Sequence, residues 1–526
     1  MKVLVMDGVS EEGLLPLRQN PAIEVVIGSK MSEDELAREI PQYEALIVRS
    51  ATKVTEKIFA CADKLKVVGR AGVGVDNIDL EAATRKGVIV VNAPDGNTIA
   101  ATEQTIAMML ALARNIPQAV GKLKQHTWDK KSFMGVELRG KTLGIIGLGR
   151  IGSAVAKRAE AMEMKIIAFD PYITEEKAAS LAVELVSFED LCRRADFMTV
   201  HMPKTKETYH MINEQALGWM KDGVRLVNCA RGGIIDEQAL YRALVENKVA
   251  GAALDVFEHE PDTDNQLIDL PNFIATPHLG ASTAEAQLNV AVDVAQEIVA
   301  ALSDQQVKNT VNIPAISPQI MNAVRPYLAL AEKIGRFQAY LLSGRVNKVE
   351  VLCSGELSNE EVTHITTATL KGLLDPILKD SVNFVNAQFL AKSRGIHVRQ
   401  SLNGHTGGYS SLVTVKVTTD QGETSVSGTL SGENTPRIVC INGYRIDVVP
   451  QGNIFYIPHT DKPRVIGAVC SLFGGYDINI ASMQVGRQEA GGTAIMMISV
   501  DGETPEQALE AITDVPGVLG VKKIEL

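Results

Sequence analysis

The sequence has few cysteines for its length, and none of them is clustered. No two stand at Cys-x-x-Cys spacing or beside histidine among the six in 526 residues, which are Cys61, Cys192, Cys229, Cys353, Cys440 and Cys470. This scatter excludes the usual zinc and redox motifs and is typical of reduced thiols. We therefore expect a cytoplasmic protein that binds no metal.

A long apolar run and an excess of basic residues are also absent. The most apolar stretch, residues 106–113, is far shorter than the ~20 residues that span a bilayer. Asp7, Glu11 and Glu12 stand where a secretory signal has its apolar core. The formal net charge of −11 argues against nucleic acid, because that partner requires a basic face. We expect neither a membrane nor a nucleic-acid partner.

Short runs rich in Val and Ile alternate with helix-like stretches over the first 280 residues. This rhythm is typical of βαβ units whose strands are buried on both faces of a parallel sheet. The long helical pattern Asn97–Arg114 interrupts it, so we predict two sheets in series rather than one. The runs are KVLVMD, IEVVIG, ALIVRS, KVVGRAG and VIVVNAP, then TLGIIGLG, KIIAFDP, FMTVHMP, VRLVNCAR, AGAALDV and NFIATPH.

The pattern changes after residue 303. A polar segment at 303–306 and the prolines Pro314 and Pro318 indicate a linker. Residues 322–400 have a mostly helical pattern, and 411–450 an antiparallel one with an Asn-Gly turn. The tail predicts a ferredoxin-like βαββαβ unit. The fold class is thus α/β, with two doubly wound Rossmann-like domains, an α+β intervening domain and the tail. The predicted domains are 1–97 with 283–303, 98–282, 317–450 and 453–526.

One glycine-rich segment predicts a dinucleotide site. Gly147, Gly149 and Gly152 follow a predicted strand and open a helix in a G-x-G-x-x-G pattern. Such glycines permit the tight turn, the approach of the pyrophosphate and close helix–strand packing. Asp170 ends the next strand about 20 residues later, as the motif requires. Its carboxylate suits the ribose hydroxyls and repels a 2′-phosphate, which favours NAD over NADP.

Later segments place polar side chains after predicted strands, at the edge where doubly wound sheets bind ligands. Oxidising an alcohol requires a base for the hydroxyl proton and a cation for a substrate carboxylate. His278 suits the base, Arg231 suits the cation, and Glu260 could orient the ring. On spacing alone, His201 and His259 remain alternative candidates for the base. A single histidine at a strand end is, moreover, more often structural than catalytic.

The segments CARGGIIDE, DVFEHEP and PHLGAST carry a family resemblance. They resemble the signature segments of the D-isomer-specific 2-hydroxyacid dehydrogenases, whose catalytic triad falls on Arg231, Glu260 and His278. The segments IVRSATKVT, VGRAGVGVDNIDLEAATRKG, GKTLGIIGLGRIG and NTVNIP narrow the resemblance to the long phosphoglycerate dehydrogenases, which have an intervening domain and a terminal ACT domain. The resemblance implies NAD-dependent oxidation of D-3-phosphoglycerate to 3-phosphohydroxypyruvate, the first step of L-serine biosynthesis.

The same resemblance implies two sets of binding residues. Cofactor contacts fall on the glycines of the motif and on Arg150, Ile151, Asp170, Cys229, Ala230, Arg231, Asp255, His278, Gly280 and Ala281. Substrate contacts fall on Arg49, Ser50, Arg70, Gly72, Val73, Gly74 and Asn97. Arg49 and Arg70 could instead be strand-end charges that only cap the sheet.

Two positions of the dehydrogenase lobes depart from the family pattern. Lys130 stands where relatives have an arginine that reaches a neighbouring subunit's site, so any such contact is made by a point charge rather than a fork. Val73 stands where some relatives have threonine, and this removes a hydroxyl near the nicotinamide pocket. Neither change removes the triad.

The tail implies regulation by an amino acid. In the resembling family ACT domains pair across subunits and bind amino acids, and His459, Asp461 and Asn479 match positions that contact serine. Arg464 departs from the family's usual glycine and could crowd the ligand carboxylate. The resemblance implies L-serine as an effector and a homo-oligomer, a dimer or a tetramer. A plain dimerisation module is the alternative, because a fold alone does not establish ligand binding.

Two other functions remain open at this point. Another dehydrogenase, acting on lactate, glyoxylate or 2-hydroxyglutarate, would keep the triad but would not need the phosphate-binding arginines or the extra domains. A nucleotide-sensing protein without turnover would not need the triad.

Overall fold

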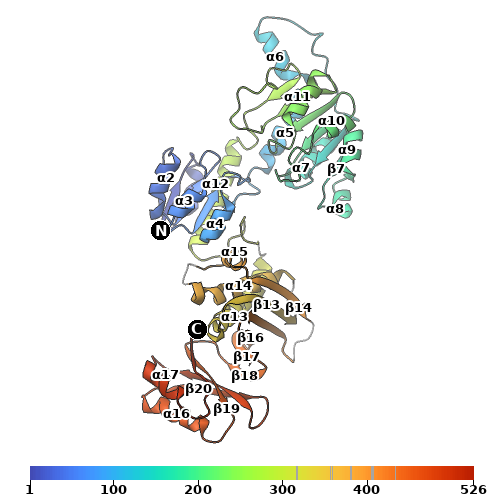
Figure 1. Ribbon diagram of the computed structural model, residues 1–526. Helices are drawn as coiled ribbons and strands as arrows, with labels where there is room; N and C mark the ends of the chain where they lie inside the picture. The colour runs from blue at the N-terminus through green and yellow to red at the C-terminus, as the bar shows by residue number, and fades with distance from the viewer. Residues whose placement is uncertain (315–317, 356, 358, 379–381, 404–407, 433) are drawn as a thin grey trace.

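The protein is described from a computed structural model, which covers residues 1–526 except 315–317, 356, 358, 379–381, 404–407 and 433. It has four parts, and Figure 1 shows them arranged along an elongated molecule with the carboxyl-terminal part farthest from the second. Within the described residues, no helix combines the length and apolarity needed to cross a membrane.

The first lobe is a five-stranded parallel sheet of order β2-β1-β3-β4-β5. Its strands are short and, except for the more exposed edge strand β2, contribute buried apolar residues to the core: β1 Lys2–Val5, β2 Glu24–Ile27, β3 Ala45–Val48, β4 Val67–Arg70 and β5 Ile89–Asn92. Helices cover both faces, as the doubly wound prediction requires: α1 Leu15–Arg18, α2 Glu33–Glu39, α3 Glu56–Cys61, α4 Leu80–Lys86 and, from much later in the chain, α12 Ala284–Leu302.

The second lobe is a seven-stranded parallel sheet of order β12-β11-β10-β9-β6-β7-β8. The strands are β6 Thr142–Ile146, β7 Lys165–Phe169, β8 Glu184–Leu185, β9 Phe197–Val200, β10 Val224–Asn228, β11 Val249–Leu254 and β12 Phe273–Ala275. The helices are α5 Thr98–Arg114, α6 Ile116–Lys124, α7 Arg150–Ala161, α8 Glu175–Ala179, α9 Phe188–Arg194, α10 Glu214–Trp219 and α11 Glu237–Val245. The predicted second sheet is confirmed, with the two-residue β8 added at its edge.

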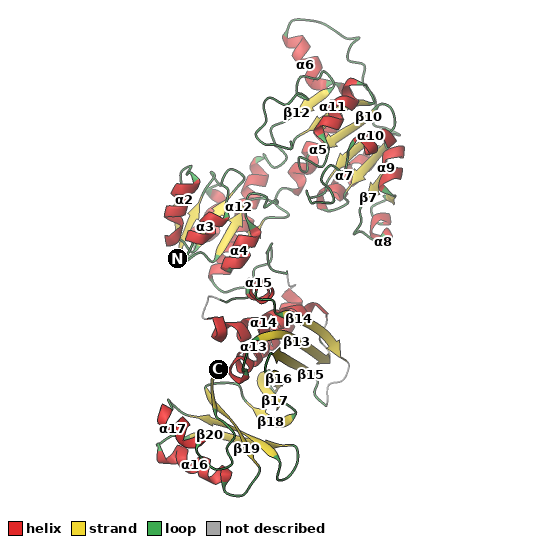
Figure 2. Ribbon diagram, viewed as in Figure 1, coloured by secondary structure: helices red, strands yellow, loops and turns green. Residues whose placement is uncertain are grey.

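The third part is a mixed six-stranded sheet, ordered β14-β13-β15-β16-β17-β18 and packed under two long helices (Figure 2). The strands are β13 Val346–Gly355, β14 His397–Asn403, β15 Ser411–Thr419, β16 Gly422–Ser431, β17 Thr435–Ile441 and β18 Tyr444–Val448, and the helices are α13 Pro318–Leu341, α14 Asn359–Leu378 and α15 Ala387–Ser393. The prediction that 322–400 is mostly helical was therefore incomplete. In β13, Val349, Val351 and Cys353 are buried whereas the intervening Glu350 and Leu352 are half-buried, and this alternation is a strand pattern.

The fourth part is the predicted βαββαβ unit, with sheet order β20-β21-β19-β22. Its elements are β19 Asn453–Thr460, α16 Val465–Gly475, β20 Ile480–Arg487, β21 Thr493–Val500, α17 Glu506–Thr513 and β22 Lys522–Glu525. One sheet face packs under α16 and α17 through Phe455, Ile457 and Phe473. The other face adds Ile454 and Met497 to the core of the third part. The third and fourth parts thus share one hydrophobic core.

The segment predicted as a linker is partly structured. Thr310 forms an antiparallel bridge with Val91, and the Asn312 side chain accepts a hydrogen bond from the Val90 amide (2.8 Å). These contacts extend the edge of the first sheet at β5, so residues 309–312 belong to the first lobe. Val311 and Ile313 alternate with Thr310 and Asn312, but a run this short was not enough to predict the pairing. The predicted linker residues 315–317 lie outside the described part of the chain.

Candidate active site

The glycine-rich segment forms the turn between β6 and α7. A Cβ at Gly152 would lie 2.0 Å from the Gly147 carbonyl oxygen, so only glycine allows the helix to begin this close to the strand. A Cβ at Gly149 would meet open space instead. The turn therefore offers a free backbone surface at the amino terminus of a 12-residue helix, which suits a pyrophosphate. These residues fit a dinucleotide.

Asp170 follows β7 and holds this turn. One carboxylate oxygen accepts from the Leu148 amide and the other from the Tyr172 amide, at 2.8 and 2.9 Å. The acid that was expected to bind ribose is thus fixed to the glycine turn by the backbone. Each oxygen keeps lone pairs that are free to accept a hydroxyl.

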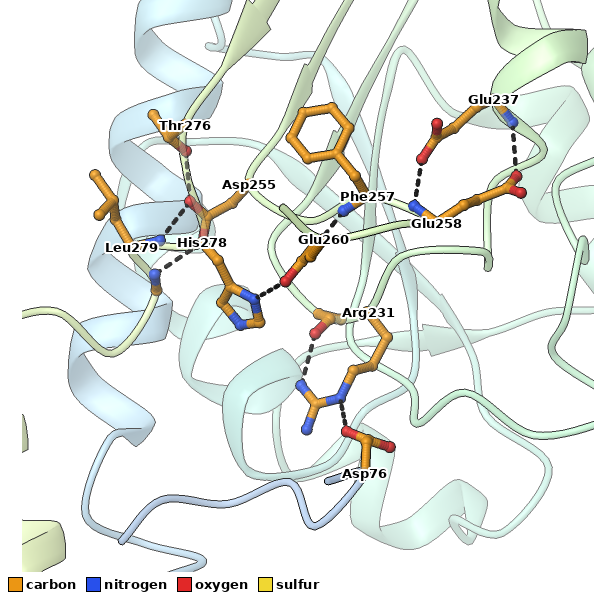
Figure 3. Close-up of polar contacts among 12 residues, drawn as sticks. Asp76, Arg231, Glu237, Asp255, Phe257, Glu258, Glu260, Thr276, His278 and Leu279 are labelled. Atoms are coloured by element: carbon orange, nitrogen blue, oxygen red, sulfur yellow. Dashed lines mark hydrogen bonds and ion pairs between the residues drawn. The ribbon is translucent and has the colours of Figure 1, made fainter. Parts of the chain in front are cut away.

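The strand-end segments meet at the carboxyl edge of the second sheet, where Arg231 follows β10, Glu260 follows β11 and His278 follows β12. Figure 3 shows the His278 ring directed toward Glu260, and Nδ1 lies 2.6 Å from Glu260 Oε2. The second Glu260 oxygen accepts from the Phe257 amide (2.9 Å). The carboxylate is therefore fixed on one side and available to the imidazole on the other.

The surroundings of Glu260 keep it ionised. Burial alone would raise its pKa. Hydrogen bonds from His278 and the Phe257 amide, with the charges of His278 and Arg231, lower that pKa below the ordinary 4.5. At neutral pH the pair therefore contains a carboxylate that can stabilise a protonated imidazole.

The structure separates the rival histidines from this pair. Burial lowers the pKa of His201 to about 3, and its Nε2 lies 3.0 Å from Thr199 Oγ1. A ring that stays neutral to such low pH is a poor proton acceptor near neutrality. His259 is exposed, and no hydrogen bond or ion pair of its side chain occurs among the described residues.

Asp255 organises the loop that carries His278. Its buried carboxylate accepts hydrogen bonds from the amides of Leu279 and Gly280, both at 2.8 Å, and from Thr276 Oγ1. His278 itself adopts a left-handed φ of +56°, a conformation that costs about 1 kcal/mol or more and needs such support. Asp255, expected to contact the cofactor, therefore also fixes the backbone of the proposed base.

Cations gather on the first-lobe side of this pair. Burial, together with the charges of Arg231 and Arg49, lowers the pKa of Arg70 to about 10, so the arginine remains charged at neutral pH. Arg70 Nε and Asn97 Oδ1 are buried without a described hydrogen-bond partner. An unpaired buried guanidinium N–H beside other cations indicates an anionic ligand, whereas the Asn97 oxygen can only accept a hydrogen bond, for example from a ligand hydroxyl.

Cys229 is packed rather than reactive. Its Sγ lies 3.4 Å from Met108 Sδ of α5, and burial raises its pKa to about 12. The neutral thiol leaves no nucleophile at this end of β10.

Two acidic residues beside the site were not predicted. Asp76 pairs with Arg231 (Nε to Oδ2, 3.1 Å) and Asp95 pairs with Arg150 (Oδ1 to Nε, 2.7 Å). Both acids belong to the first lobe and both arginines to the second. Acids in loops after β4 and β5 were the available signal, but their partners depend on how the lobes are placed.

Comparisons with known families match successive parts of the chain. The D-isomer specific 2-hydroxyacid dehydrogenase NAD binding domain matches residues 106–280, the D-3-phosphoglycerate dehydrogenase intervening domain 323–442, and the ACT domain 459–517. The D-3-phosphoglycerate dehydrogenases of Methanocaldococcus jannaschii and Bacillus subtilis are each 47% identical to this chain over its whole length. The match covers 100% of the first relative and 99% of the second. The chain belongs to the D-3-phosphoglycerate dehydrogenase family.

Solved structures agree on the fold of the dehydrogenase lobes. D-lactate dehydrogenase from Aquifex aeolicus, complexed with NAD and lactic acid, is 31% identical with a TM-score of 0.54, covering 60% of this chain and all of that one. An acyclic imino acid reductase in complex with NADPH is 26% identical with a TM-score of 0.54, covering 59% and 100%. A phosphoglycerate dehydrogenase with this NAD-binding domain uses a nicotinamide dinucleotide.

Within the described part of the chain, no hydrogen bond joins the predicted effector residues to one another. Asp461 accepts from Arg487 (3.3 Å) and the Gly491 amide (3.2 Å), whereas Asn479 donates to Asp501 (2.7 Å). His459 is buried, and its Nε2 has no described partner. Arg464 caps α16 with a left-handed φ of +79°, where glycine would be relaxed.

The helix α6 and the loop after it project from the second lobe (Figure 1). Trp128 and Met134 are each 85% exposed there, and Trp128 and Lys130 line one shallow depression of about 230 Å³. Apolar side chains this exposed on a projecting segment indicate a protein contact.

Proposed function

We propose that this protein oxidises D-3-phosphoglycerate to 3-phosphohydroxypyruvate with NAD. The observation that carries the proposal is the group of arginines beside an imidazole–carboxylate pair. Arg49, Arg70 and Arg231 supply charge for a substrate with both a phosphate and a carboxylate. A substrate such as lactate has only the carboxylate, so it would leave the buried Arg70 without an anion.

In this proposal, each of the three triad residues has one role. Arg231 binds the substrate carboxylate and fixes the hydroxyl-bearing carbon. His278 takes the proton of the 2-hydroxyl, and Glu260 stabilises the imidazolium that forms. Bound NAD supplies the hydride acceptor. The hydroxyl proton thus goes to His278, the carbon that bears the hydroxyl gives its hydride to NAD, and the product is the ketone.

The test is NADH production from a panel of 2-hydroxyacids with matched variants. D-3-phosphoglycerate should give a higher kcat/KM than D-lactate, glycolate or D-2-hydroxyglutarate. His278→Asn should lower kcat by ~10²–10⁴, the usual contribution of a positioned base. His259→Asn is the matched control and should stay within about two-fold, because its ring is exposed outside the pair. Equal activity in the two variants would remove His278 from the role.

NAD rather than NADP is the second part of the proposal, because Asp170 places a negative charge where a 2′-phosphate would lie. Asp170→Ala should weaken the binding of NAD and allow the enzyme to use NADP. The measurement is kcat/KM for both cofactors in the wild type and the variant. Equal use of NAD and NADP by the wild type would contradict this reading of Asp170.

Regulation and assembly complete the proposal. L-serine is the proposed effector of the ACT domain, with His459, Asp461 and Asn479 as contacts, and calorimetry with millimolar L-serine tests it. A homo-oligomer in the cytoplasm is proposed on the exposed Trp128 and Met134 and on the scattered thiols. If calorimetry detected no L-serine binding, with or without NAD, dimerisation would be the remaining role for the ACT domain.

A further inference from the structure

One contact crosses between the lobes at the proposed carboxylate-binding arginine. Arg231 Nε donates to Asp76 Oδ2 (3.1 Å), as Figure 3 shows. Arg231 Nη1 donates to the Ala230 carbonyl (2.7 Å). No hydrogen bond of Nη2 occurs within the described part of the chain. Two of the three nitrogens are thus held by protein, and the third has both of its hydrogens free.

The backbone beneath Arg231 is shaped for this position. A Cβ at Gly74 would lie 2.0 Å from Arg231 Nη2 and 3.0 Å from Asp76 Oδ2. The guanidinium therefore rests against the Gly74 backbone of the first lobe, although Arg231 belongs to the second. The absence of a side chain at Gly74 is what allows the arginine and Asp76 to meet.

The backbone next to Asp76 is held in place by contacts within the first lobe. The neighbouring Asn77 donates from Nδ2 to the carbonyls of Arg49 (2.7 Å) and Thr52 (2.6 Å). Ile78 is buried and forms a parallel bridge with Val54. Although the Asp76 side chain is 73% exposed, its backbone is fixed to the loop after β3, so its direction is set by the first lobe.

We propose that Asp76 is a positioning residue for Arg231. It holds Nε from the opposite lobe and so directs the free Nη2 edge of the guanidinium into the site, where a substrate carboxylate binds. A long arginine side chain has several rotatable bonds, and fixing it before binding removes an entropic cost of substrate association. The proposal rests on the proposed carboxylate-binding role of Arg231.

Single substitutions give the first test. Asp76→Ala should raise KM for D-3-phosphoglycerate about three- to ten-fold, since a charged hydrogen bond is lost but solvent screens it. KM for NAD should stay within about two-fold, and Asp76→Asn, which keeps an oxygen acceptor, should recover part of the loss. Asp63→Ala is the control, because Asp63 is an exposed first-lobe aspartate paired with Lys86. Thermal unfolding of each variant checks that the fold is retained.

A double-mutant cycle identifies the route. In an Arg231→Ala background, Asp76→Ala should change kcat/KM by less than about two-fold, because its partner is already absent. Equal effects of Asp76→Ala with and without Arg231 would overturn the positioning role, as would an unchanged KM in Asp76→Ala. If Arg231→Ala itself left kcat/KM unchanged, the proposed function of Arg231 would fail instead.

Discussion

At the scale of single residues, the site is built by backbone groups that hold reactive side chains. Asp255, Glu260 and Asp170 each accept hydrogen bonds from main-chain amides. A carboxylate held in this way has a fixed direction, so the imidazole or hydroxyl it faces needs less ordering at the moment of reaction. The left-handed backbone of His278 is tolerated because Asp255 supports the next two amides.

Replacing Glu260 with Gln should separate charge from geometry. The amide keeps the size of the side chain and a hydrogen-bonding oxygen, but it removes the negative charge that stabilises the protonated form of the base. We expect residual activity, with the acidic limb of kcat/KM against pH moved to lower pH. The measurement is a pH profile from about pH 5 to 9 for both proteins, since a bell or limb reports the free enzyme's groups. An unmoved limb with reduced kcat would leave Glu260 only a structural role.

Residue contacts within one sheet edge were more predictable than contacts between lobes. The sequence order of Glu260 and His278 after two neighbouring strands was enough to suggest their pairing, because parallel strands end at one edge. The pairs Asp76–Arg231 and Asp95–Arg150 join segments 155 and 55 residues apart across two domains. No periodicity within either domain contains that information.

At the scale of elements, most strands with an apolar signal were found, β13 being the exception, and two strands without such a signal were missed. The turn Asn442-Gly443 was predicted from its residues, and φ is +48° and +83° there, between β17 and β18. All seven residues of β14 are exposed, so its sequence has no alternation of apolar and polar residues that burial would require. β8 has only two residues. Both lie at sheet edges, where burial constrains the sequence least.

At the scale of the whole molecule, the intervening and ACT domains form one packed body. The ACT sheet and the intervening sheet share a core, and Lys522 Nζ donates to the carbonyls of Leu341 and Leu342 at the end of α13. Packed interiors transmit displacement because they have little free volume. A ligand that shifts the ACT domain will therefore shift the intervening domain with it.

This body meets the first lobe at α4. Asn383 Nδ2 donates to the Gly87 carbonyl (2.8 Å), and the Arg85 guanidinium lies 5.9 Å from the centre of the Phe389 ring. Figure 1 shows α15, which carries Phe389, beside the first lobe. The amino-terminal end of α4 follows its N-cap residue Asp79, which is three residues after Asp76. A movement at Gly87 can thus reach the loop that holds Arg231.

The last prediction concerns this contact. The proposed effector L-serine is expected to inhibit the enzyme, and in the double variant Asn383→Ala, Phe389→Ala this inhibition should weaken, while calorimetry should still detect L-serine binding and uninhibited kcat should stay within about two-fold. Coupling between linked sites is ordinarily ~5–150-fold, and we expect the variant to reduce it at least about five-fold. Val398→Ala, on the exposed strand β14, is the control and should leave inhibition intact. Because coupling is reciprocal, D-3-phosphoglycerate should change the L-serine affinity of the wild type more than that of the variant. Equal inhibition of wild type and variant would mean that the signal travels by another route, between subunits rather than through α4.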